Sequence, residues 1–124
     1  MDFYLPDKDF TGSLLKPGAA MGKTRKFTVS ATTLDDFGIQ PDVIKLDLQG
    51  AELGALRGAQ SILPGVKAIL CEVNFVPRYE GCAMFHEIAD ILHIYGLRLF
   101  RLYEVHSDKS GQWQFADALF VRRS

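Results

Sequence analysis

Two runs of apolar and β-branched residues in the middle of the chain indicate buried strands. The first covers residues 42 to 48 (DVIKLDL) and the second covers residues 66 to 75 (VKAILCEVNF). Such runs are typical of strands that are covered on both faces of a sheet. A Thr-rich alternating segment at 26 to 34 (KFTVSATTL) predicts a further strand before them.

Two segments have apolar residues at the three- and four-residue spacing of amphipathic helices. The first begins at Gly50 and extends to Leu63, where a Pro-Gly pair ends it. The second covers residues 84 to 95, and Gly96 follows as its C-terminal cap. Each helix follows one of the two buried strands, so the middle of the chain alternates strand and helix.

The last part of the chain predicts a hairpin. Strands are expected at residues 97 to 105 and 117 to 123, with a polar loop at 106 to 116 between them. Because no helix separates these strands, they should pair antiparallel. Together with the alternating middle, this predicts an α/β fold: a mixed, mostly parallel sheet with helices on both faces. We expect a single domain over residues 1 to 124, of which residues 1 to 25 are rich in loops.

Composition limits the partners and the cellular location. The 124 residues carry a net charge of -1 and are 48% hydrophobic. Neither nucleic acid nor a membrane surface is expected as a partner at this charge, and no apolar run is long enough to span a membrane. The acidic N-terminus is not a signal peptide, so the cytoplasm is the expected location. Cys71 lies in an apolar run and should be buried, whereas Cys82 lies in a loop and could be exposed; their spacing does not favour zinc.

Polar side chains gather where the two buried strands end. The first strand ends in LDLQG and the second in CEVNF, which places Asp47, Gln49, Glu72 and Asn74 at one rim of the sheet. Ligands of open α/β sheets bind beyond this rim. Glu52 follows in the first helical turn, where the helix N-terminus would stabilise its charge without any functional role. Lys45 lies on the same face of the strand as Asp47, and an ion pair between them would explain Asp47 without any functional role.

Histidines and aromatic residues offer weaker candidates. His86 and His93 are seven residues apart on the second helix, where a surface position is expected rather than a metal site. His106 lies where a strand meets a loop and could reach the rim. Trp113 and Phe115 could stack on a ligand, although packing within the core or the loop is the favoured interpretation.

The order of several motifs resembles the FkbM-type methyltransferases. The chain has a TLDD turn, then the block KLDLQGAE at the strand-to-helix corner, then CEV, YEG and a terminal DALF. The resemblance extends from about Phe3 to Arg123. It implies a Rossmann-like fold with a seven-stranded mixed sheet, whose last strand is inserted antiparallel. It also implies S-adenosylmethionine as the cofactor and a hydroxyl group of a sugar or secondary metabolite as the methyl acceptor.

The resemblance also assigns roles to residues. Asp47 would lie near the reacting centre and the cofactor, as a base or as a ligand of the acceptor hydroxyl or of a metal, with Glu72 as a second catalytic candidate. Thr33 would lie where adenine contacts often occur in this fold. The acceptor would be bound by the remaining polar residues of the motifs: Gln49, Glu52, Tyr79, Glu80 and Asp117.

The glycine-rich turn that holds the cofactor in such enzymes is missing, because no G-x-G occurs before Thr32. The chain therefore resembles a family member that begins after its first two strands. We expect a sheet of five strands with an abnormal edge beside the strand of Asp47, which could pair with a second copy or a complementing chain. The isolated chain is expected to bind S-adenosylmethionine weakly and to be inactive. A non-catalytic binding module and an inactive fragment remain alternatives.

Overall fold

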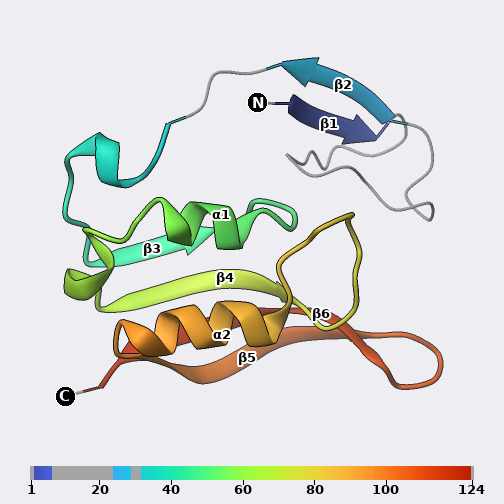
Figure 1. Cartoon of the computed structure of the whole chain (residues 1–124). Helices are drawn as coiled ribbons and strands as arrows, with labels where there is room; N and C mark the ends of the chain where they lie inside the picture. The colour runs from blue at the N-terminus through green and yellow to red at the C-terminus, as the bar shows by residue number, and fades with distance from the viewer. Residues whose placement is uncertain (1, 7–23, 29–31, 124) are drawn as a thin grey trace.

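A four-stranded mixed sheet forms the centre of the protein (Figure 1). The computed structural model describes residues 2–6, 24–28 and 32–123. Within them the strand order is β3-β4-β6-β5. The bounds are Val43–Leu46 for β3, Ala68–Asn74 for β4, Leu97–Ser107 for β5 and Trp113–Arg122 for β6.

The last strand in sequence lies inside the sheet. β3 and β4 pair in parallel, and β6 is inserted antiparallel between β4 and β5. The mixed α/β sheet and its antiparallel last strand are therefore as expected. The predicted five strands become four, because the described residues of the segment at 26 to 34 do not join this sheet. Instead β2 (Thr24–Thr28) pairs antiparallel with β1 (Asp2–Pro6) in a separate two-stranded sheet.

Both helices pack on one face of the sheet. α1 (Glu52–Arg57) and α2 (Phe85–Ile94) contact each other and share one hydrophobic core with the strands. The buried side chains of that core alternate along the paired strands, as Ile69, Cys71 and Val73 do on β4. On the other face Val43 of β3 is 63% exposed. The prediction of helices on both faces is therefore not met within the described residues. None of the helices there is long and apolar enough to cross a membrane.

The first helix is much shorter than the predicted segment 50 to 63. α1 ends at Arg57, where Gly58 follows as its C-terminal cap, and a short 3-10 helix, η3 (Leu63–Gly65), comes after a turn. Glycine is a poor helix former, and Gly58 is packed closely: a Cβ there would lie 3.1 Å from the Cβ of Thr33. The Asp35 carboxylate then accepts a hydrogen bond from the N–H of Ser61 at 3.0 Å, which fixes the turn.

The hairpin at the end of the chain is longer than predicted. β5 extends to Ser107 and β6 begins at Trp113, so the predicted loop 106 to 116 shrinks to a tight turn. The Asp108 side chain organises that turn by accepting hydrogen bonds from the N–H groups of Ser110 (2.8 Å) and Gln112 (3.1 Å). The hydrogen bond from the Ser110 hydroxyl is the main reason why the pKa of Asp108 lies below its usual value.

Arg122 ties the end of the sheet to the helical layer. Its guanidinium donates to the carbonyl oxygens of Val66 (2.8 Å), Tyr95 (2.7 Å) and Leu63 (2.8 Å). Val66 and Tyr95 are the C-caps of η3 and α2, where backbone acceptors lack partners within the helix. The Leu63 carbonyl also accepts from the N–H of Val66 at 3.1 Å. One side chain therefore binds three carbonyls that come from two different segments.

Candidate functional site

The corner after β3 is formed by two residues in the left-handed region. Gln49 has φ 52° and Gly50 has φ 103°. A side-chain-bearing residue rarely adopts such a φ, so the corner is held by other contacts. The carbonyl of Gly50 accepts a hydrogen bond of 3.0 Å from the N–H of Ala83, which ties the corner to the start of α2. The chain then turns directly into α1 at Glu52.

This turn brings Gln49 back onto Asp47. The Gln49 side-chain amide donates to Asp47 Oδ1 at 2.9 Å, and its oxygen accepts from the Tyr79 hydroxyl, also at 2.9 Å. Tyr79 is buried, whereas Asp47 is exposed. A buried phenol thus orients an amide, and the amide orients an exposed carboxylate. Asp47 is held by Gln49, so the Lys45–Asp47 ion pair does not explain its position.

Glu72, Asp117 and Arg78 form the second part of the rim. Glu72 on β4 lies opposite Asp117 on β6, and Arg78 Nη1 lies 2.8 Å from Glu72 Oε1. Burial raises the pKa of Glu72; Arg78 opposes this shift, and the charges of Asp47 and Asp117 add to it. We call Asp47, Glu52, Glu72 and Asp117 the acidic cluster.

Aromatic rings line the rim beside Arg78. The guanidinium carbon of Arg78 lies 3.8 Å from the ring centroid of Phe115, a cation–π geometry. His106 stacks on the same ring at 4.2 Å. Trp113 packs edge-on against Phe75 at 5.4 Å and is 47% exposed. These contacts show that His106, Trp113 and Phe115 pack against protein groups, although Trp113 retains an accessible surface at the rim.

Glu52 is the member of the acidic cluster that the fold buries completely. Its Oε1 accepts a 3.2 Å hydrogen bond from the Leu48 N–H, whereas its Oε2 has no hydrogen-bond partner in the described part of the chain. Burial raises its pKa, and the nearby charge of Glu72 adds to that shift. Asn74 Oδ1 is likewise buried without a partner there. Glu52 lies at the start of a six-residue helix, but the stabilisation of negative charge at a helix N-terminus does not explain why this carboxyl is removed from water.

The structure brings together most of the residues that the sequence singled out, but not Thr33. The Thr33 hydroxyl accepts from the Asp36 N–H at 3.1 Å, and its side chain faces Gly58. Gly58 follows the last residue of α1, so Thr33 lies at the opposite end of that helix from Glu52. Glu80 follows Tyr79 in the loop and is exposed. Arg78, which pairs with Glu72, was not singled out from the sequence. Its position next to Tyr79 in the loop after β4 was the sequence feature that could have indicated it.

Cysteine and histidine contribute little to this rim. Cys71 is buried as expected, and burial raises its pKa to about 12. Cys82 is also buried, at 8% exposure, which corrects the expectation of an exposed loop thiol. His86 and His93 lie on the exposed surface of α2. Within the described ranges, no three His, Cys, Asp or Glu side chains are arranged to hold a metal ion.

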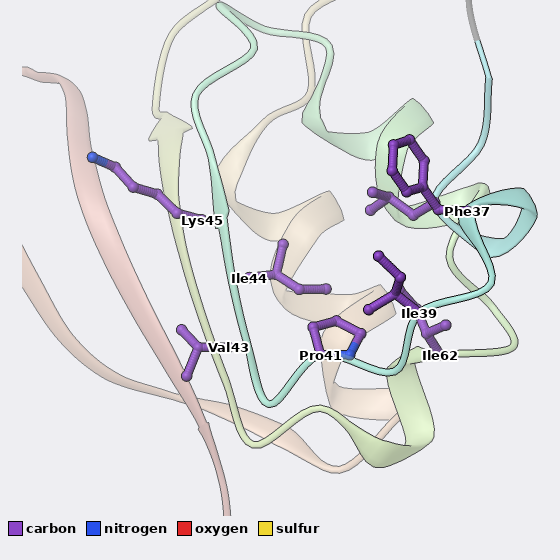
Figure 2. Close-up of a pocket in the computed structure, with 8 residues that line it drawn as sticks. Phe37, Ile39, Pro41, Val43, Ile44, Lys45 and Ile62 are labelled. Carbon is purple, nitrogen blue, oxygen red and sulfur yellow. The ribbon is translucent and has the colours of Figure 1, made fainter.

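An apolar groove of about 290 Å³ lies along β3, away from the acidic cluster (Figure 2). Ile44 of β3 points into it, and Phe37, Ile39 and Pro41 form the opposite wall. Val43 and Lys45 extend to the other side of the strand. The groove contains none of the residues of the acidic cluster, and its walls lack the polar groups that would orient a small ligand.

Comparison with known proteins identifies the family. The family model described as Methyltransferase FkbM domain matches residues 2–99, which include the Asp47 corner, β4 and α2. No curated protein and no solved structure matches the chain. Since the match covers most of the 124 residues, this chain belongs to the FkbM methyltransferase domain family.

Proposed function

We propose that the acidic cluster is the acceptor side of a Rossmann-like, S-adenosylmethionine-dependent methyltransferase site that methylates a hydroxyl oxygen. The family match supports methyl transfer as the class of reaction. The observation that carries the proposal is the oriented, exposed carboxylate of Asp47 beyond the end of β3. That position is where ligands of open α/β sheets bind.

Asp47 is the proposed general base. Gln49 occupies Oδ1, and Oδ2 accepts no hydrogen bond within the described residues, so Oδ2 is available to an acceptor hydroxyl. When bound, S-adenosylmethionine supplies a methyl group on a positively charged sulfur. Asp47 would take the proton of the acceptor hydroxyl as the methyl group passes from sulfur to oxygen, and the sulfur would leave as a neutral thioether. Positioned general bases contribute about 10²–10⁴-fold to such rates.

The other residues of the rim bind and orient the acceptor. Gln49 fixes the carboxylate of Asp47 by a hydrogen bond of 2.9 Å, and the Tyr79 hydroxyl fixes Gln49 by another of 2.9 Å. Asp117, Glu80 and the second oxygen of Glu72 offer acceptors for further hydroxyl groups, which suits a polyhydroxylated small molecule. Glu52 is fully buried and is not included among these acceptors. Thr33 is not included in this proposal, because it lies beyond the other end of α1.

The described residues fit the cofactor only in part. Carboxylates at the rim can accept hydrogen bonds from ribose hydroxyls, but the sequence contains no G-x-G turn that would let a backbone approach the cofactor closely. We therefore infer that the isolated chain holds S-adenosylmethionine weakly and is inactive at ordinary cofactor concentrations. Raising the cofactor concentration should restore occupancy by mass action.

The test is methyl transfer to a panel of hydroxylated sugars and metabolites, followed by mass spectrometry. We expect no product at about 10 µM cofactor and a methyl ether at about 5 mM, as mass action predicts for a weakly held ligand. Asp47→Asn should lower that rate by about 10²-fold or more. Asp42→Asn is the matched control, since Asp42 is an exposed aspartate that pairs with Lys67. Absence of product at millimolar cofactor, or equal rates for the two variants, would overturn the proposal.

A further inference from the structure

The two free edges of the sheet are protected very differently. β5 carries three register irregularities where it pairs with β6, and its sequence contains Arg98, Arg101 and Glu104. Bulges and charged side chains of this kind prevent edge strands from pairing with other chains. β3 pairs with β4 in an uninterrupted register, and Lys45 is its only charged residue. Of the two edges, β3 is therefore the one left open to pairing.

The backbone hydrogen bonds show which groups of β3 are available. Lys67 and Ala68 both donate to the carbonyl of Asp42, at 2.7 and 3.3 Å, so Asp42 points toward β4. The N–H and C=O of one residue in a parallel strand point to the same neighbour, and successive residues alternate. Ile44 and Leu46 therefore point toward β4, whereas Val43 and Lys45 point away from it. No described strand pairs with these outward groups.

We propose that β3 pairs antiparallel with β3 of a second copy of this chain, across a two-fold axis at Ile44. In this register Val43 lies opposite the partner subunit's Lys45, and Ile44 lies opposite the partner subunit's Ile44. Both residues with outward backbone groups then form hydrogen-bonded pairs, which gives four hydrogen bonds across the axis. Shifting the pairing by two residues would instead place Lys45 opposite its own counterpart, and like charges in that position are unfavourable.

The apolar groove favours the same occupant. Phe37 and Ile39 line the groove along this edge and are 65% and 58% exposed, and Val43, whose side chain extends to the other side of β3, is 63% exposed. Ile44 faces into the groove (Figure 2), so the partner subunit's Ile44 would cover it from the same side of the extended sheet. An interface on a two-fold axis uses the same surface of both copies. The edge of β3 can therefore pair with the same edge of a second copy, and no other partner is needed.

This pairing also affects the acidic cluster. Continued past the ends of β3, the register places the partner subunit's Pro41 opposite Asp47. The apolar segment of the second copy that contains Phe37 and Ile39 would therefore border the open side of the Asp47 corner. Each copy would contribute part of the wall around the acidic cluster of the other.

Sedimentation velocity across a range of chain concentrations tests the pairing. We expect a monomer–dimer equilibrium. Val43→Glu places a carboxylate opposite the partner subunit's Lys45 and should tighten the dimer, whereas Val43→Lys should weaken it, with dissociation constants at least about tenfold apart. Val43 is 63% exposed, so both variants should fold, and circular dichroism checks this. A monomer at every concentration up to about 1 mM, a range in which weak dimers form, or the reverse order of the two variants, would overturn the proposal.

Amide hydrogen exchange provides a second, independent readout. The outward N–H groups of Val43 and Lys45 should become protected as the chain concentration rises. Those of Ile44 and Leu46 bond to β4 and should be protected at all concentrations. A dimer in which Val43 and Lys45 exchange as fast as in the monomer would place the interface elsewhere and refute the β3 pairing.

Discussion

Glu52→Gln should raise the free energy of unfolding at neutral pH. The wild-type carboxyl is fully buried, and only one of its oxygens accepts a described hydrogen bond. Glutamine has nearly the same shape and keeps an oxygen for the Leu48 N–H. The substitution removes the buried charge but preserves that contact, so its effect reports on the charge itself.

The expected gain is about 1–2 kcal/mol at pH 8. A buried polar atom without a partner costs about 1–3 kcal/mol, and more when it carries charge. The glutamine amide still places an NH₂ where Glu52 Oε2 lacks a partner, which offsets part of the gain. The difference should also depend on pH. Burial raises the pKa of Glu52 above its usual value of 4.5, so the folded wild type keeps a proton that the unfolded chain releases.

Wild-type stability should therefore fall, relative to the variant, as pH rises from 4.5 through the folded-state pKa of Glu52. Below 4.5 the carboxyl is neutral in both states, and the two proteins should have similar stability. Urea denaturation of both proteins between about pH 4 and pH 8 measures this difference, since the midpoint shift reports stability at constant slope. Glu104→Gln, at an exposed position on β5, is the control for losing one carboxylate. Parallel stability curves for wild type and Glu52→Gln would refute the reasoning.

Two further predictions concern the fold. Arg122→Lys should lower the free energy of unfolding by about 2–3 kcal/mol, because lysine cannot reach all three carbonyls that the guanidinium binds. Arg123→Lys, at an exposed neighbouring position, is the control and should leave the stability unchanged in the same urea titration. Equal effects of the two substitutions would contradict the three-way contact. Cys71, whose pKa burial raises to about 12, should resist iodoacetamide at pH 8 until urea unfolds the chain; mass spectrometry of the native protein counts the labelled thiols, and rapid labelling of Cys71 would contradict its burial.

The sequence predicted the elements whose apolar pattern is strong. β4 and α2 matched because their buried residues repeat with periods of two and about three and a half. The acid-bearing corner after β3 followed from strand ends that share one rim. The length of α1 was wrong, because apolar spacing continued past Gly58 although the helix did not. The extent of the β5–β6 hairpin was hidden, since most β5 side chains are exposed and give no alternation to detect.

Other features depend on tertiary contacts that no local pattern contains. The burial of Glu52 and Cys82 follows from how α1 and the loop before α2 fold onto the core. Arg78 is part of the rim through its tertiary contacts with Glu72 of β4 and Phe115 of β6. The separation of Thr33 from the acidic cluster is set by the direction of α1, which the local pattern around Thr33 does not reveal, and its contact with adenine stays a prediction.

The position of β6 between β4 and β5 has a consequence for synthesis on the ribosome. β4 and β5 are synthesised before β6, but in the sheet β6 lies between them and pairs with both. Neither strand therefore has this partner until β6 has emerged. A nascent chain that stops before Trp113 therefore exposes the apolar flank of β4 to solvent and to chaperones. The sheet can only close after translation has passed Arg122, so this domain must fold late rather than strand by strand.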